Sequence, residues 1–317
     1  MSQIEEFEEF RPLLFSIAYR ILGSVSEAED AVQETWLRFE ASPTRPDSVK
    51  SFLSTVVTRV SIDVLRSARV RREEYVGPWL PEPLLSDPYD DPARAAELAD
   101  SVSMAALVLL ERLSPLERAV FVLREVFAFD FPAVASAVGR SENACRQLVV
   151  RARRHMAAGR PRYEADRRMR DELAERFFFA LREGDVDGLR ELLAADAQMI
   201  GDGGGKSPQL ARAVSGADNI ARLLASLLPV LARVDVTVEP CQVNGQPGAI
   251  FRDREHKVLN TWTLDVLDDR VQTVRSVTNP DKLGHLGPVA DAWALSREAR
   301  LARRTEPRHG LSGRLTA

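Results

Sequence analysis

The sequence predicts a multidomain protein in which two all-α domains precede an α+β domain. Apolar residues recur at helical spacing through residues 7–72 and 93–156, and a proline-rich segment, residues 75–92, separates the two stretches. Strand-like runs appear only in the last third of the chain, around a predicted helix over residues 216–231. Helices followed by strands are typical of an α+β domain with a curved antiparallel sheet. We expect helical domains over 1–75 and 93–160, a linker over 76–92, the α+β domain over 166–283 and a frayed tail over 284–317.

Length and composition narrow the class of protein. A chain of 317 residues is longer than one typical domain, and its apolar fraction of 45% is enough for packed cores. The formal net charge of −4 is unusual for a dedicated DNA-binding protein. Basic charge must therefore be segregated from acidic surface that serves another partner.

No motif in the sequence predicts a metal, a cofactor or a membrane segment. Cys145 and Cys241 lack the spacing of metal ligands and fit a reducing cytosol. No apolar run is long enough to cross a bilayer, and the acidic start MSQIEEFEEF is unlike a signal peptide. We expect a cytoplasmic protein with no membrane partner.

The first helical domain combines an acidic helix face with a basic helix. A helix over residues 7–22 stops at Gly23, and the next is predicted to open at Ser26, with Glu29 completing a capping box. A third helix, residues 48–72, is apolar on one side and ends in arginines. A DNA-binding module rarely presents an acidic face unless a basic protein partner docks there. The acidic face carries Asp30, Gln33, Glu34 and Leu37, and the basic helix carries Arg59, Arg66, Arg69, Arg71 and Arg72.

The second helical domain has the pattern of a helix-turn-helix. A short helix capped by Asp130 meets a turn at Gly139, and a longer helix starts at Ser141. One face of the longer helix is apolar, around Cys145 and Leu148, while the other is suited to a major groove, where Arg reads guanine and Asn or Gln reads adenine. A solvated basic helix is the alternative, and the agreement of turn, caps and faces favours recognition. The outward residues are Ser141, Asn143, Arg146, Gln147, Val150, Arg151 and Arg154, the last expected on phosphate.

Three stretches of the helical half resemble bacterial RNA polymerase sigma factors. EDAVQETWLRF and SFLSTVVTRVSIDVLRSARVRREEY resemble region two, and LSPLERAVFVLREVFAFDFPAVASAVGRSENACRQLVVRARRHM resembles region four. The short linker and the absence of a third region point to the extracytoplasmic-function (ECF) class. The sequence departs from that pattern at Phe52, where tryptophan is common, and at Ala144, where threonine often occurs.

The resemblance implies two partners, core RNA polymerase (its β′ and β subunits) and promoter DNA. Asp30, Gln33 and Glu34 would bind the coiled coil of β′. The helix over residues 48–72 would contact and open the minus-ten element, and the Ser141 helix would read the minus-thirty-five element.

Three further motifs resemble the ECF subgroup with a fused SnoaL-like domain. They are WLPEP (residues 79–83), DGGGK (residues 202–206) and NPDKL (residues 279–283). The resemblance implies a cone-shaped α+β barrel that regulates the sigma factor in cis, in place of a separate anti-sigma protein. The sign of that regulation is not readable from the sequence. The candidate docking residues are Trp79, Glu82, Asp202, Gly203, Gly204, Gly205, Lys206, Asn279, Asp281 and Lys282.

The DGGGK segment has two interpretations. Its three glycines free the backbone for a tight loop, and its spacing excludes a phosphate-binding P-loop. It is either a flexible strand-to-helix loop or a docking loop for the linker, in which Glu82 meets Lys206 and Trp79 packs nearby. The large apolar residues of the linker, such as Trp79 and Leu84, favour docking, since a solvated spacer would not carry them.

The α+β domain is not predicted to be catalytic. His256, Asn260, Trp262 and Asp265 lie on strand-like segments and are candidates to face a cavity, which leaves an unknown small ligand open. No set of nucleophile, base and orienting group is visible among them. Two alternatives to a non-enzymatic sigma factor remain. One is a helix-turn-helix regulator with a ligand-sensing domain, which would bind DNA without polymerase, and the other is a bifunctional protein with a catalytic SnoaL-like domain.

Overall fold

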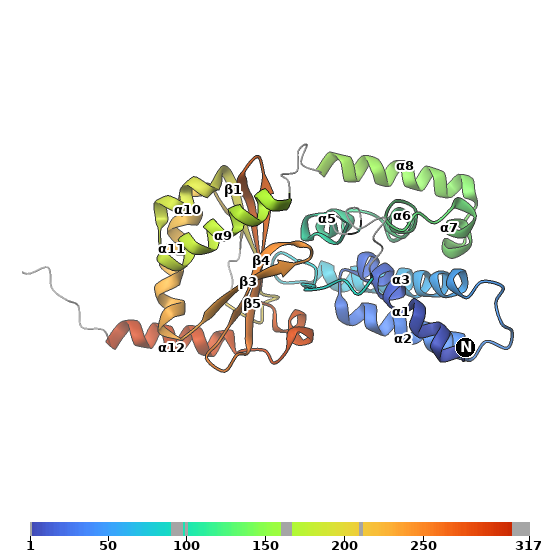
Figure 1. Ribbon diagram of the computed structural model, residues 1–317, viewed down its shortest axis with the longest axis horizontal. Helices are drawn as coiled ribbons and strands as arrows, with labels where there is room; N and C mark the ends of the chain where they lie inside the picture. The colour runs from blue at the N-terminus through green and yellow to red at the C-terminus, as the bar shows by residue number, and fades with distance from the viewer. Residues whose placement is uncertain (1, 90–97, 99–100, 160–166, 209–211, 306–317) are drawn as a thin grey trace, which may run out of the picture.

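The computed structural model describes residues 2–89, 98, 101–159, 167–208 and 212–305, except for the side chains of residues 68–73, 158–159, 228–230 and 302–305. The helical half and the α+β half lie side by side (Figure 1). The linker after α3 passes between them, because its residues contact both.

Three helices form the first part, α1 (Gln3–Leu22), α2 (Val25–Glu40) and α3 (Val49–Glu73). Helix α1 ends at Gly23, whose φ of 69° favours glycine. The chain reverses there at once, so Ser24 becomes the N-cap of α2 and its side chain accepts a hydrogen bond from the Glu27 amide. The predicted start at Ser26 with a Glu29 capping box is therefore wrong by two residues.

The second part contains α5 (Met104–Leu110), α6 (Pro115–Phe121), the π-helical turn η2 (Val122–Val126), α7 (Phe131–Val138) and α8 (Glu142–Gly159). The capping box of Ser114 with Glu117 forms, and Asp130 caps α7, as the sequence predicts. Gly139 has a φ of 63° and ends α7, so α7 and α8 form the predicted helix-turn-helix.

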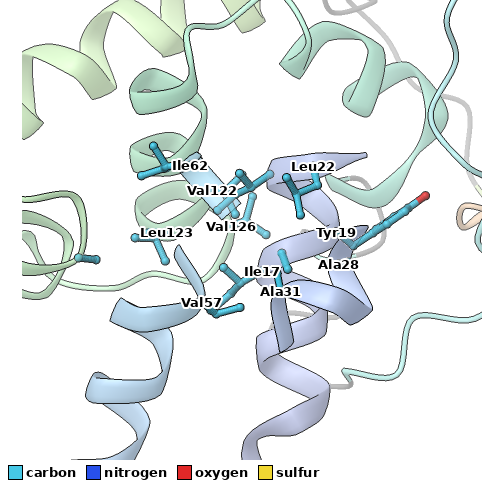
Figure 2. Packing of buried hydrophobic residues seen from close by; sticks show 14 of the residues in the cluster. Ile17, Tyr19, Leu22, Ala28, Ala31, Val57, Ile62, Val122, Leu123 and Val126 are labelled. Carbon is cyan, nitrogen blue, oxygen red and sulfur yellow. The ribbon is translucent and has the colours of Figure 1, made fainter. Parts of the chain in front are cut away.

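The two helical parts share one hydrophobic core. Ile17 and Leu22 of α1 and Val57 of α3 lie against Val122 and Val126 of η2 (Figure 2). Leu84 of the linker belongs to the same core. The apolar faces of both parts are thus buried against each other, although the sequence predicts them as separate domains joined by a linker.

The last part is an α+β domain. Its helices are α9 (Arg167–Glu183), α10 (Val186–Leu192), α11 (Ala217–Arg233) and α12 (Ala292–Thr305), with 3-10 turns η3 (Pro280–Lys282) and η4 (Gly284–Leu286). Its strands are β1 (Leu193–Asp202), β2 (Val214–Ser215), β3 (Thr237–Val243), β4 (Gln246–Arg252), β5 (Val258–Leu267) and β6 (Arg270–Val277). They form one sheet in the order β2-β1-β6-β5-β4-β3.

Two expectations about this domain need correction. The sheet is mixed, because β1 pairs with β6 in parallel, whereas the sequence predicts an antiparallel sheet. Strands β1 and β6 are separated by α11 and four strands, so no hairpin imposes an antiparallel pairing on them. The expected frayed tail contains α12, which buries Ala299 and packs Leu295 against the domain core.

The two faces of the sheet have different neighbours. Helices α9, α10 and α11 pack with one face in the domain's own core. Residues of the other face, Ile250, Val258 and Val277, cluster with Leu80 of the linker and Met104 of α5. The fused domain therefore offers one sheet face to the rest of the chain (Figure 1).

Candidate functional site

The acidic face of α2 is exposed. Asp30 and Gln33 are exposed, Leu37 is 56% exposed, and Glu34 forms an ion pair of 2.8 Å with Arg38 one turn away. The opposite face, which includes Ala31 and Val32, is buried in the shared core. The structure thus brings the four predicted residues together on a free surface of the described chain.

The basic helix α3 is partly engaged by the helix-turn-helix. The guanidinium of Arg59 donates to the carbonyl oxygens of Ser136 (2.7 Å) and Ala137 (3.1 Å). These carbonyls lie in the last turn of α7, where helical carbonyls lack partners and a cation is favoured. Arg66 is exposed and pairs with Asp63. The side chains of Arg69, Arg71 and Arg72 lie outside the described residues.

The recognition helix α8 has the two predicted faces. Cys145, Leu148, Val149 and Ala152 are buried, and burial raises the pKa of the Cys145 thiol. Every predicted outward residue is exposed: Ser141, Asn143, Arg146, Gln147, Val150, Arg151 and Arg154.

Three arginines of α8 form ion pairs with acidic residues. Arg146 pairs with Glu142 at 2.9 Å and lies over the ring of Phe131. Arg151 pairs with Glu117 at 3.0 Å. Arg153 pairs with Glu125, and this hydrogen bond raises the pKa of Arg153. The arginine side chains of these three pairs are 51%, 56% and 60% exposed, so the pairs are weak and salt-sensitive.

A buried carboxylate joins the linker to the fused domain. Asp202, at the end of β1, is fully buried and accepts hydrogen bonds from the Tyr75 hydroxyl (2.5 Å), the Leu80 amide (2.8 Å) and the Lys282 ammonium (2.7 Å). Burial, followed by the hydrogen bond to Asp202, raises the pKa of Tyr75, which keeps its hydroxyl protonated as a donor.

Lys282 is the centre of the same cluster. Its ammonium also donates to the Leu80 carbonyl and lies over the rings of Trp79 (4.2 Å) and Tyr75 (4.8 Å). Such cation–π contacts are stronger in a desolvated site. Asn279 donates to the Tyr75 hydroxyl at 2.7 Å. Residues of all three predicted motifs therefore meet in one contact, here called the linker dock: Tyr75, Trp79, Leu80, Asp202, Asn279 and Lys282.

The glycines of the loop allow this close approach. A Cβ on Gly204, whose φ is 56°, would come within 2.3 Å of the Asn279 amide and 2.9 Å of the Tyr75 hydroxyl. Gly205 has a φ of 70° and lies against Val76. The carbonyl of Gly203 accepts the turn hydrogen bond from the Lys206 amide. The loop is thus part of the contact surface with the linker.

The expected pairing of Glu82 with Lys206 is wrong. Glu82 is buried and caps the start of α2, where it accepts from the Ser24 hydroxyl and the Val25 amide, both at 2.7 Å. The free amides of a helix N-terminus satisfy a buried carboxylate more completely than a distant lysine would. Lys206 instead forms an exposed pair of 2.5 Å with Asp281.

The β3–β4 hairpin supplies a contact that the motifs do not reveal. Asn244 is 1% exposed and inserts between the helical parts. Its side chain accepts from the Leu84 amide (3.0 Å) and donates to the Tyr19 hydroxyl (2.7 Å) and the Val102 carbonyl (3.1 Å). Asn244 and Gly245 both have positive φ, and an Asn-Gly pair predicts such a turn, but no sequence signal shows that its tip is buried.

Two buried arginines connect α1 with the linker, with the segment before α5 and with α6. Arg20 is fully buried, pairs with Asp87 of the linker at 2.8 Å and donates to the Ser101 hydroxyl and the Leu98 carbonyl. Arg118 of α6 donates to the Arg20 carbonyl and pairs with Glu111. Both buried charges are therefore compensated by carboxylates, Asp87 for Arg20 and Glu111 for Arg118.

A cavity of about 190 Å³ lies in the fused domain. Of the four residues predicted to face a cavity, two line it and two do not. Asn260 and Trp262 line it. Asp265 does not, because it forms an ion pair with Arg275 and accepts from Gln246. His256 is exposed in the β4–β5 turn with a φ of 60°. Expectations that His256 and Asp265 face the cavity are therefore wrong.

Within the described residues, no group of three or more His, Cys, Asp and Glu residues is placed to hold a metal ion. Across the same residues, no helix is both long and apolar enough to span a bilayer.

The architecture defines a protein with two helical modules, an exposed acidic helix face and a helix-turn-helix, joined to an α+β domain. Three families match the chain: Sigma-70 region 2 over residues 7–71, Sigma-70 region 4 over residues 103–156 and the SnoaL-like domain over residues 174–281.

Relatives and a solved structure agree with these families. The chain is 37% identical over 295 residues to the ECF RNA polymerase sigma factor SigJ of Mycobacterium tuberculosis, covering 88% of this chain and 93% of that protein. It is 30% identical to SigG of the same species, covering 84% and 78%. The crystal structure of SigJ aligns with a TM-score of 0.68 and 34% identity over 89% of this chain and 98% of that one. The chain belongs to the ECF RNA polymerase sigma factors.

Proposed function

We propose that this sigma factor binds core RNA polymerase and promoter DNA through three surfaces, and that its fused domain holds it in a closed, inactive arrangement. The exposed face of α2, with Asp30, Gln33 and Glu34, is the contact with the β′ coiled coil. Helix α3 contacts the minus-ten element, and α8 reads the minus-thirty-five element. The protein acts in the cytoplasm, with the polymerase.

The main support for a closed state is that the two helical parts share one hydrophobic core. The two promoter elements lie about 25 base pairs apart, or roughly 85 Å of B-DNA. Helix α7 instead packs directly on α3, and Arg59 is bonded to its last carbonyls. The two reading helices therefore have to separate before both elements can be bound, and Arg59 is released for DNA only by that separation.

The fused domain stabilises the closed state at two points. The linker dock holds residues 75–80 against the end of β1, and Asn244 bonds to α1, the linker and the segment before α5. A chain held at both points has no free linker with which to span the promoter. Release of the dock frees the linker, so the proposed sign of the regulation is repression.

The fused domain is proposed to regulate and not to catalyse. Among the described residues, its cavity contains no nucleophile with an adjacent base and orienting group. The chain itself is then no enzyme, and it supports synthesis of RNA only as a subunit of the polymerase.

A double-mutant cycle tests the regulation. Trp79→Ala and Lys282→Ala each remove one side of the contact at 4.2 Å and are expected to raise run-off transcription with core polymerase while leaving core binding intact. The double variant is expected to show no further increase, because the contact is already lost. Fully additive effects would show that the two residues act separately and would contradict the linker dock.

A further inference from the structure

One aromatic ring of the helix-turn-helix carries two arginine side chains. Phe131 is the first residue of α7, and it is half-buried. The guanidinium carbon of Arg146, on α8, lies 4.7 Å from the centre of this ring, and that of Arg124, on η2, lies 4.8 Å from it. Guanidinium groups are attracted to an aromatic face at such distances. The ring therefore connects the reading helix α8 with the two elements that precede it.

The position of this ring is fixed by contacts outside α8. The side chain of Asp130 caps α7, so the backbone that carries Phe131 is held at a defined helix start. Phe131 also packs against the shared hydrophobic core, and Arg124 is anchored because it donates to the Phe129 carbonyl at 2.9 Å. Arg146 is by contrast a long, exposed side chain, which loses much rotamer freedom when it binds a partner in one geometry.

The ring contact leaves the donors of Arg146 usable. A guanidinium is planar, so its N–H groups point outward in its own plane while Phe131 contacts its flat face. In that plane, Nη1 donates to Asn143 Oδ1 at 3.2 Å and Nη2 donates to Glu142 Oε2 at 2.9 Å. The O6 and N7 atoms of guanine accept from an arginine through the same kind of edge. The in-plane partners of Arg146 can therefore be exchanged for a base while the ring contact persists.

We propose that Phe131 is a positioning residue for promoter recognition, whose ring holds Arg146 by its face so that the N–H edge meets a guanine of the minus-thirty-five element. A side chain held in its binding geometry loses less conformational freedom on binding, which strengthens the contact that this side chain makes. The gain falls on the base pair that Arg146 reads, whereas a ring that only packed in the core would support all promoters alike. This inference rests on the proposed reading of the minus-thirty-five element by α8.

The test measures which sequences the full-length sigma factor with core polymerase selects from promoter fragments whose minus-ten and minus-thirty-five elements are randomised, by sequencing the bound DNA. Arg146→Ala marks the base pair that Arg146 reads. Phe131→Leu is expected to reduce the preference at that base pair about two- to fivefold, as loss of an exposed cation–π contact does, and to leave the other positions unchanged. Phe131→Tyr, which keeps the ring, is expected to retain the preference. Phe129→Leu is the matched control, because no arginine of the described chain lies over the ring of Phe129.

A double variant separates positioning from packing. Phe131→Leu in the Arg146→Ala background is expected to cause no further loss of preference, because the side chain that the ring positions is already absent. The preference is a ratio between sequences, so a partly unfolded variant still reports it. Should Phe131→Leu not fold at all, Phe131→Met removes the ring with a side chain of similar length.

Three outcomes would overturn the positioning role: an unchanged preference in Phe131→Leu, a loss in Phe131→Tyr as large as that in Phe131→Leu, or a further loss in the double variant. If Arg146→Ala relaxes one base pair and Phe131→Leu does not, the positioning role fails alone and the proposed reading by α8 stands. If Arg146→Ala relaxes no base pair, the reading by Arg146 fails and the positioning role fails with it. The two failures are therefore told apart by the Arg146→Ala variant.

Discussion

Replacing the buried carboxylate of the linker dock is expected to activate the sigma factor. Asp202→Asn keeps the size of the side chain but removes the charge that compensates Lys282, whose side chain is only 8% exposed. Removing one partner of a buried ion pair costs about 3–5 kcal/mol. The docked state would therefore lose roughly 100- to 4,000-fold in its equilibrium against the undocked state.

Asp281→Asn is the matched control. Asp281 pairs with Lys206, and the two side chains are 59% and 57% exposed, so the lost pair contributes about 0–1 kcal/mol. Both variants remove one negative charge from neighbouring motifs. Only Asp202→Asn is expected to raise promoter-directed transcription by purified core polymerase. A folded Asp202→Asn protein, verified by circular dichroism, that transcribes like the wild type and like Asp281→Asn would refute the role of the dock.

Three further predictions concern the other surfaces. Reversal of Asp30 and Glu34 to lysine should weaken binding to core polymerase without unfolding the chain, and unchanged affinity for the β′ coiled coil in a titration would exclude this face. Arg146→Ala should cost about 1–3 kcal/mol of promoter-binding free energy and relax specificity at one base pair, whereas Arg154→Ala should weaken binding to all promoters alike. If Arg146→Ala weakens binding equally on every promoter variant, Arg146 reads no base. Asn244→Gly, which keeps the positive φ but removes three side-chain hydrogen bonds, should raise transcription, and a wild-type level would confine regulation to the linker dock.

The elements of the helical half could be predicted because local signals decide them. The capping box at Ser114, the cap at Asp130 and the turn at Gly139 act within a few residues, and the structure has all three. The sequence does not decide where α2 starts, because Ser24 and Ser26 are both good N-cap residues. In the structure Ser24 is the N-cap, and its hydroxyl also donates to the buried Glu82, which lies far along the chain.

The sequence does not predict which side chains pair between the parts of the chain, and the reason is physical. The three motifs predicted which segments meet, but the partners of each charge depend on burial. Opposite charge alone predicts that Glu82 pairs with Lys206, yet Glu82 is buried at a helix N-terminus and Lys206 is exposed to solvent. Asn244 carries an ordinary turn signal, and its role follows only from where the hairpin tip is placed.

The most direct test of the closed state is the distance between α3 and α8 in the free protein and in the transcription complex. Spin labels at Asp63→Cys and His155→Cys, both exposed positions, would be measured by pulsed electron paramagnetic resonance in a Cys241→Ser background. We predict one short distance in the free chain, an added long distance in Asp202→Asn, and a separation larger by tens of ångströms with core polymerase and promoter. The same short distance in the free protein and in the promoter complex would contradict the account.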